Sequence, residues 1–265
     1  MQYSPKDYVK PNKSIIYKKA SGVNLALNVY YPENCREKTP VALCVHGGGW
    51  TAIDKENQPI DNWQGSWMKH QAVYYAKRGF VGIEITYRSI KLEGVEITDI
   101  VEDCEDAVRF VRKNIEYADV DNMFAIGDSA GGQLVLCLAF SKDEKVRPKA
   151  VVACNPVTDC VEKTWEYISC SEEIRRKYSP MFNVKKSEVS FLVVHGTADD
   201  IVPYETAVEY VEKMKKIGND IELLSIDGGK HAFILYEYKS TDDEVLEYMH
   251  KIDKFIDKQF PNMKS

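Results

Sequence analysis

Residues Phe124 to Leu134 read "FAIGDSAGGQL", and this stretch decides the fold class. The apolar run "MFAIG" is typical of a buried strand, and "QLVLCLAF" further on has the pattern of a helix. Between them Ser129 stands in the order "GDSAG". Small residues on both sides allow a very tight turn that lifts the hydroxyl to the carboxyl edge of a sheet. The stretch therefore predicts a strand, a sharp turn and a helix, with Ser129 either a nucleophile or a small turn residue.

Similar apolar runs recur on both sides of this stretch and alternate with helical patterns. From Thr98 onward, apolar residues fall on one helical face and acidic residues crowd the first turns. An alternating run before and after Ser21-Gly22 indicates an antiparallel hairpin. We therefore predict a three-layer α/β fold with a mostly parallel sheet and helices on both faces. The other expected strands are "PVALCVHGG", "GFVGIEITYR", "KAVVACNPV", "VSFLVVHG" and "DIELLSID".

Neither repeats nor low-complexity linkers divide the 265 residues, so we expect a single domain over residues 1–265. One segment breaks the alternation of strands and helices. Residues 159–186 lie between two expected strands and are too long for a plain connection and too polar for a core. We expect them to form a small lid-like insertion.

Composition and charge exclude several classes of function. The formal net charge is −6 and the basic residues are scattered, which disfavours nucleic acid and anionic membranes as partners. No run of about eighteen apolar residues and no apolar signal segment are present, so we expect a cytoplasmic protein that does not cross a membrane. The seven cysteines include no C-x-x-C pair and indicate reduced, mostly buried thiols.

A serine nucleophile needs a base, and five histidines are available. His70 and His250 fall in expected helices with polar neighbours and are interpreted as surface residues. His46 and His195 each end an expected strand before a glycine, where they would shape loops. His231 instead lies in "DGGKHAF", a glycine-rich loop between the last expected strand and the last helix. We predict His231 as the base.

The base needs a carboxylate to orient it, and "VVHGTADDIVP" supplies Asp199 and Asp200 after a strand. Adjacent loop side chains diverge, so only one of them can face His231. Either choice gives the chain order serine, aspartate, histidine, which differs from the order in chymotrypsin-like and subtilisin-like proteases.

Negative charge on a substrate carbonyl oxygen needs hydrogen-bond donors, and "HGGGW" (residues 46–50) offers three successive glycines after a strand. We predict that the N–H groups of Gly48, Gly49 and Ala130 form an oxyanion hole. The alternatives are a flexible loop or a phosphate cradle, but "GGGWTAIDKEN" lacks the Lys-Ser/Thr pair and the helix entry of phosphate loops.

Together, "HGGGW", "GDSAGG", "HGTADDIVP" and "GGKHAF" resemble the α/β-hydrolase superfamily, and within it the HGGG-type esterase/lipase group related to hormone-sensitive lipase. The chain is most similar to the compact bacterial carbohydrate esterases of acetyl xylan type. The resemblance implies an eight-stranded sheet and selects Asp199, which matches the aspartate of the family's H-G-x-x-D-x-x-V-P stretch. Gln133 departs from the asparagine that is usual in the lipase-like members.

The resemblance implies a serine carboxylic-ester hydrolase that cleaves short acyl esters, acetyl above all, on carbohydrates such as acetylated xylo- or manno-oligosaccharides. Its triad would be Ser129, Asp199 and His231, with no metal and no organic cofactor. Of the four tryptophans, Trp50 and Trp165 are the expected substrate-binding walls, whereas Trp63 and Trp67 are as readily explained by core packing. A homo-oligomer is left open. The alternatives are an arylformamidase or peptidase on the same scaffold, and a non-catalytic small-molecule receptor.

Overall fold

One sheet of eight strands organises the part of the chain that the structure describes. The computed structural model describes residues 2–51, 66–162, 165, 168 and 170–263. Only the two pairings that involve β2 are antiparallel, and the others are parallel. In spatial order the strands are β1 (Lys13–Ala20), β2 (Val23–Tyr30), β4 (Val81–Ile85), β3 (Thr39–Val45), β5 (Ala118–Asp128), β6 (Ala150–Cys154), β7 (Ser190–Gly196) and β8 (Ile221–Ile226).

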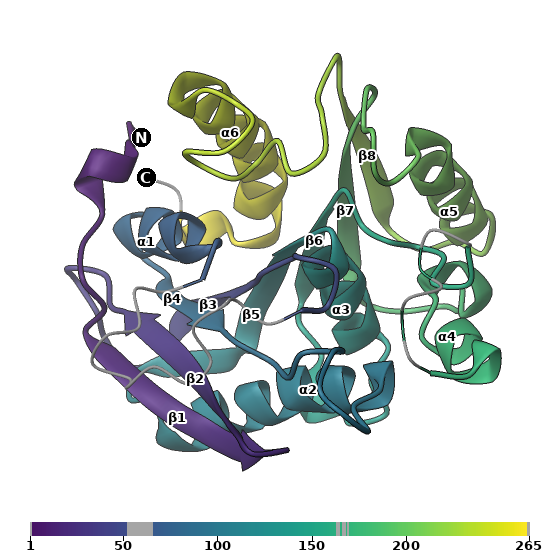
Figure 1. Cartoon of the computed structure of the whole chain (residues 1–265). Helices are drawn as coiled ribbons and strands as arrows, with labels where there is room; N and C mark the ends of the chain where they lie inside the picture. Colours follow the sequence, from purple (N-terminus) through teal and green to yellow (C-terminus); the bar gives the residue numbers. More distant parts are fainter. Residues whose placement is uncertain (1, 52–65, 163–164, 166–167, 169, 264–265) are drawn as a thin grey trace.

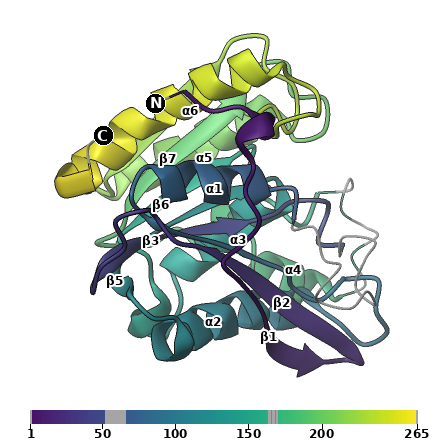
Figure 2. The ribbon, with the colours of Figure 1, turned by 90° about the vertical axis from the view of Figure 1, so that its left-hand side faces the viewer.

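Helices cover both faces of this sheet, so the predicted three-layer α/β fold is confirmed (Figures 1 and 2). One face packs against α1 (Lys69–Lys77) and α6 (Asp242–Gln259). The other face packs against α2 (Ile97–Asn114), α3 (Ala130–Ala139) and α5 (Tyr204–Lys216). Strands β3, β4, β6 and β7 and the second half of β5 are almost entirely buried on both sides, which explains their mostly apolar sequences.

The expected hairpin joins β1 to β2 through a two-residue turn. Ser21 and Gly22 have φ angles of 49° and 77°, and Ala20 pairs with Val23. Two positive φ angles are the signature of the turn whose twist matches that of the flanking strands. The amino-terminal strands therefore extend the parallel sheet with an antiparallel edge.

Local sequence specifies where the two longest helices begin. Helix α6 begins with a capping box in which Thr241 and Glu244 each bond the other's backbone N–H. At the start of helix α2, the backbone N–H of Glu96 donates to the carboxylate of Asp99 at 2.9 Å. In both helices acidic side chains stand in the first turn, where the helix dipole favours them.

The described part of the expected insertion, residues 159–186, contains a short helix α4 (Glu172–Lys177) and the 3₁₀ turn η5 (Pro180–Phe182). Other 3₁₀ turns in the described part of the chain are η1 (Pro5–Asp7), η3 (Glu144–Val146) and η6 (Pro261–Met263). Among the described residues, no helix combines the length and the apolar character that crossing a bilayer requires.

Candidate active site

Ser129 occupies the turn between β5 and α3, where its backbone is strained. Its φ and ψ angles are 55° and −117°, a conformation that L-residues rarely adopt. Glycines flank it because backbones meet closely here: a Cβ on Gly131 would collide with the carbonyl oxygen of Val45, and one on Gly127 with that of Gly131. The "GDSAG" spacing thus has a steric cause, and it sets the hydroxyl at the carboxyl edge of the sheet.

Three side chains from separate loops form one hydrogen-bonded chain at this edge. Ser129 Oγ lies 2.9 Å from His231 Nε2, and His231 Nδ1 lies 2.9 Å from Asp199 Oδ2. When Nδ1–H donates to the carboxylate, Nε2 is left as an acceptor for the serine hydroxyl. The structure therefore brings together the three side chains that the sequence predicted as nucleophile, base and acid.

Asp199 is held more firmly than its loop position suggests. The backbone N–H groups of Ile201 and Val202 both donate to its Oδ1 at 2.9 Å. His195 Nε2 lies 3.3 Å from its Oδ2 and 3.0 Å from the carbonyl oxygen of Val202. Burial alone would raise the pKa of Asp199, but the hydrogen bonds from His195 and His231 outweigh it and hold the pKa below its usual range. A buried carboxylate that stays ionised is suited to orienting His231.

His195 was interpreted from sequence as a loop-shaping histidine, and the structure shows which loop it shapes. It bridges the carboxylate of Asp199 to the backbone of Val202. The spacing H-x-x-x-D in "HGTAD" was the available signal for this contact. His70, interpreted as a surface residue, is instead buried and lies 2.9 Å from the hydroxyl of Tyr3, because the amino-terminal segment packs over it. That interpretation was wrong.

The glycine loop after β3 lies directly against the serine turn. A Cβ on Gly47 would stand 2.6 Å from the carbonyl oxygen of Asp128 and 3.0 Å from Cβ of Ser129. Gly48 and Gly49 have φ angles of 92° and 63°, which glycine adopts without strain. Gly48, Gly49, Ser129 and His231 border the same cavity, of about 680 Å³. Gly48 and Gly49, two of the three residues predicted to supply oxyanion donors, therefore border the same cavity as the candidate nucleophile.

The cavity has an apolar wall that sequence analysis assigned only in part. Trp165 lines it as expected, whereas Trp50 is completely buried, does not border it, and packs behind the glycine loop. The expectation that Trp50 forms a substrate wall is thus not met. Trp67 takes that place: it is 51% exposed, and a Cβ on Gly48 would lie 2.8 Å from its ring. Trp63 lies outside the described residues.

Asp128 lies within the serine turn and is almost completely buried. Burial raises the pKa of this carboxyl group from 3.8 to about 7; the electrostatic interaction with His231 opposes the shift and that with Asp199 adds to it. The sequence motif alone suggested no role for Asp128. Burial at the end of β5 was the signal that could have identified it as a second titrating group.

Behind the glycine loop, Tyr87 supports the backbone from the end of β4. Its hydroxyl lies 2.7 Å from the carbonyl oxygen of His46 and 3.0 Å from that of Gly47. The ring of Tyr87 stacks on the imidazole of His46 at 4.3 Å, and His46 Nδ1 lies 2.8 Å from the Gly47 carbonyl. Burial lowers the pKa of His46 to about 4, so the ring is neutral near pH 7. His46 thus shapes the loop, as its sequence position indicated.

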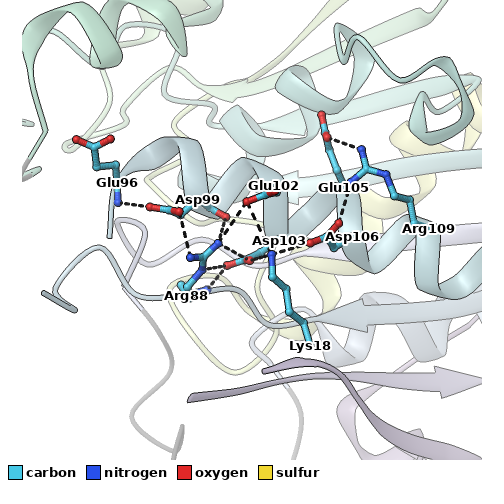
Figure 3. Close-up of polar contacts among 9 residues, drawn as sticks. All are labelled: Lys18, Arg88, Glu96, Asp99, Glu102, Asp103, Glu105, Asp106 and Arg109. Atoms are coloured by element: carbon cyan, nitrogen blue, oxygen red, sulfur yellow. Dashed lines mark hydrogen bonds and ion pairs between the residues drawn. The ribbon is translucent and has the colours of Figure 1, made fainter. Parts of the chain in front are cut away.

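An ion-pair cluster on α2 anchors the segment that carries Tyr87 (Figure 3). Arg88 donates to Asp103 from its side chain at 2.8 and 2.9 Å and from its backbone N–H at 3.0 Å. Lys18 of β1 reaches the same carboxylate at 2.8 Å. The cluster therefore ties β1, the end of β4 and α2 together behind the site. Among the described residues, no group of three His, Cys, Asp or Glu side chains is arranged to hold a metal ion.

Comparison with known proteins gives the family. The profile of the BD-FAE family matches residues 27–214, which is most of the chain. The chain belongs to the BD-FAE family. Solved structures agree: esterase 2 of Thermogutta terrifontis, phosphorylated by paraoxon, is 26% identical with a TM-score of 0.77 over 93% of each chain. Its native form is also 26% identical, with a TM-score of 0.77 over 97% of this BD-FAE chain and 95% of the esterase.

Sequence relatives of this BD-FAE protein include a plant enzyme and parts of much larger fungal proteins. Probable carboxylesterase 4, mitochondrial, of Arabidopsis thaliana is 22% identical over 92% of this chain and 74% of its own length. The non-reducing polyketide synthase pkbA of Emericella nidulans is 26% identical over 58% of this chain. The chain spans only 6% of that synthase and 14% of the synthase ascC of Acremonium egyptiacum. The structural neighbours group the chain with esterases of the α/β-hydrolase fold.

Proposed function

We propose that this protein is a serine carboxylic-ester hydrolase that removes short acyl groups, acetyl above all, from carbohydrate substrates. One observation carries the proposal: Ser129 Oγ lies 2.9 Å from His231 Nε2, at a cavity that the glycine loop also borders. A serine hydroxyl is a poor nucleophile alone, and a neighbouring neutral imidazole that can take its proton activates it.

The reaction follows from this arrangement. Ser129 Oγ attacks the ester carbonyl carbon while its proton passes to His231 Nε2, and Asp199 stabilises the resulting imidazolium. The N–H groups of Gly48, Gly49 and Ala130 donate to the oxyanion of the tetrahedral intermediate. The imidazolium then protonates the departing alcohol, which leaves an acyl group on Ser129. Water, deprotonated by His231, attacks this acyl-enzyme and releases the acid and the free serine.

Two observations support the choice of substrate. Trp67, beside Gly48, and the 62% exposed Tyr238 border the cavity and offer apolar faces to a ring on the alcohol side of the ester. A solved structure of Thermogutta terrifontis esterase 2, 26% identical to this chain, is described as propionate bound, and that short acid supports a short acyl group here. Acetylated xylo- or manno-oligosaccharides combine a sugar ring on the alcohol side of the ester with a short acyl group.

The first test is Ser129→Ala, assayed with p-nitrophenyl acetate. Removing the hydroxyl should lower kcat by about 10⁴-fold or more, with the unfolding temperature little changed, because the side chain makes no large packing contribution. A rate equal to that of the wild type would contradict the proposed reaction.

A substrate panel then separates the remaining candidates. One preparation is compared on acetylated xylo- and manno-oligosaccharides, p-nitrophenyl acyl esters and N-formylkynurenine, with acetate or formate release as the readout. We expect the highest kcat/KM for an acetylated sugar. A preference for the formyl amide would favour an arylformamidase, and inactivity on every ester together with tight binding of a small molecule would favour a receptor.

A further inference from the structure

Gln133 lies on α3, four residues after Ser129, and its side-chain amide joins two segments that are far apart in sequence. Its Oε1 accepts a hydrogen bond of 2.9 Å from the indole Nε1–H of Trp50. Its Nε2 donates to the carbonyl oxygen of Tyr178, at 2.8 Å, in the insertion after β6. Gln133 and Trp50 are both completely buried. The amide thus connects the end of the glycine loop to the insertion.

Trp50 links Gln133 to the glycine loop, so a shift of Trp50 would change the backbone conformation of the loop. It follows Gly49 directly, and its φ angle of 55° continues the positive angles of the two glycines. Its carbonyl oxygen accepts from the N–H of Ile90 at 2.7 Å, and its ring meets that of Trp165 edge to face at 5.5 Å. A residue keeps such a strained backbone conformation only when the surrounding contacts enforce that conformation.

The two ends of an amide side chain meet both demands of this position. The side chain here must accept a hydrogen bond from the indole and donate one to a carbonyl group at the same time, which neither a carboxylate nor an apolar side chain can do. A buried Trp50 N–H without an acceptor would be costly, so the ring would shift and carry the loop backbone with it.

We infer that Gln133 is a positioning residue that sets the oxyanion-binding conformation of the glycine loop, by fixing Trp50 against the insertion at Tyr178. The inference rests on the proposed ester hydrolysis for its kinetic readout. It also gives the described part of the insertion a role at Tyr178, whose carbonyl oxygen provides the fixed end of the connection.

The kinetic test uses Gln133→Leu, Trp50→Phe and the double variant, assayed with p-nitrophenyl acetate. Since a misplaced transition-state contact acts on the chemical step, each single variant should lower kcat by about ten- to hundredfold and change KM by less than about twofold. Because both variants break the same bond, the double variant should be little worse than either one. Unchanged kcat in Gln133→Leu, or fully additive losses in the double variant, would overturn the inference.

Cys137→Ala is the matched control. Cys137 Sγ lies 3.0 Å from Gln133 Nε2, yet its removal leaves the bonds to Trp50 and Tyr178 in place. We expect its kcat to stay within about twofold of the wild type. A loss in this control as large as that of Gln133→Leu would show a general packing effect and overturn the inference.

A second readout does not depend on catalysis. In ¹⁵N spectra of the folded proteins, Gln133→Leu should shift the indole signal of Trp50 and the amide signals of Gly48 and Gly49, whereas Cys137→Ala should not. If the wild type hydrolyses no ester, the proposed function fails, but these signals still decide whether Gln133 sets the loop. Unmoved glycine signals in Gln133→Leu would refute that.

Discussion

Two neighbouring aspartates show how differently adjacent residues can be placed. The side chain of Asp199 is buried and faces His231, His195 and two backbone N–H groups. Asp200 points to solvent and lies 3.4 Å from the amino group of Lys239. The sequence offered both as the acid, and only a resemblance favoured Asp199. The turn after β7 decides between them because it directs one carboxylate inward and the other outward.

Replacing each aspartate tests this assignment. Asp199→Asn should lower kcat by about 10⁴-fold, because an amide cannot hold His231 in the required tautomer or stabilise its charge. Asp200→Asn, the matched control, should remain within about twofold of the wild type since its ion pair is exposed. Hydrolysis of p-nitrophenyl acetate measures both, with a thermal melt to verify folding. Equal losses in the two variants would remove Asp199 from its proposed role.

Asp128 makes the free energy of unfolding depend on pH. Its pKa is about 7 in the folded protein and about 3.9 in an unfolded chain, so the native state binds its proton more tightly. The stability that this proton provides is complete below about pH 4 and is lost as pH rises through about 7.

Asp128→Asn should abolish this contribution. Between pH 5 and pH 8, the free energy of unfolding of the wild type should fall by about 2 to 3 kcal/mol more than that of the variant. Urea denaturation at the two pH values measures the difference, and Asp200→Asn should retain the wild-type dependence. The same pH dependence in Asp128→Asn and the wild type would show that Asp128 is ionised in the native state throughout.

At the level of elements, acidic side chains of α2 bind Lys18 of β1 and Arg88, which follows β4. The Asp103 side chain is completely buried, and its partners Arg88 and Lys18 have side chains that are 8% and 20% exposed. Charges this far from water attract each other strongly, but they are costly when one partner is lost. The cluster therefore favours this one arrangement of β1, the end of β4 and α2, because another arrangement would leave a buried charge without its partner (Figure 3).

Asp103→Ala tests this role. It should lower the free energy of unfolding by about 3 kcal/mol, because Arg88 and Lys18 would keep buried charge with fewer partners. Arg109→Ala on the same helix is the control, since Arg109 is 41% exposed and its pairs should contribute less than about 1 kcal/mol. Urea denaturation measures both. Equal destabilisation by the two variants would mean that burial does not set the strength of these pairs.

At the scale of the whole molecule, the sheet brings loops from both halves of the chain to one cavity. Gly48 and Trp67 come from the first third, Ser129 from the centre, and His231 and Tyr238 from the last fifth. The carboxyl ends of parallel strands meet at one edge, so residues that follow separate strands become neighbours. Side chains such as Trp67, for which the sequence offered no reason to expect a place at this cavity, also border it.

Trp67→Ala should change substrate preference more than the chemical step. Loss of its ring should raise KM by about 3- to 10-fold for acetates of cyclic alcohols and by less for methyl acetate, because only the former can lie on the indole. Phe182→Ala is the control: Phe182 is 43% exposed and lies outside the cavity lining. A uniform loss over both ester types would count against a ring-binding role for Trp67.

The sequence by itself determined the order of strands and helices along the chain and the tight turn at Ser129, and it indicated the loop from which His231 reaches that serine. These depend on apolar periodicity and on glycines at places where backbones touch, and both are local in the chain. Tertiary structure alone decided that Trp50 is buried and Trp67 borders the cavity, that His195 holds Asp199, and that Gln133 reaches Tyr178. These facts depend on which side chains meet across separate strands and loops, and such contacts have no local periodicity from which to predict them.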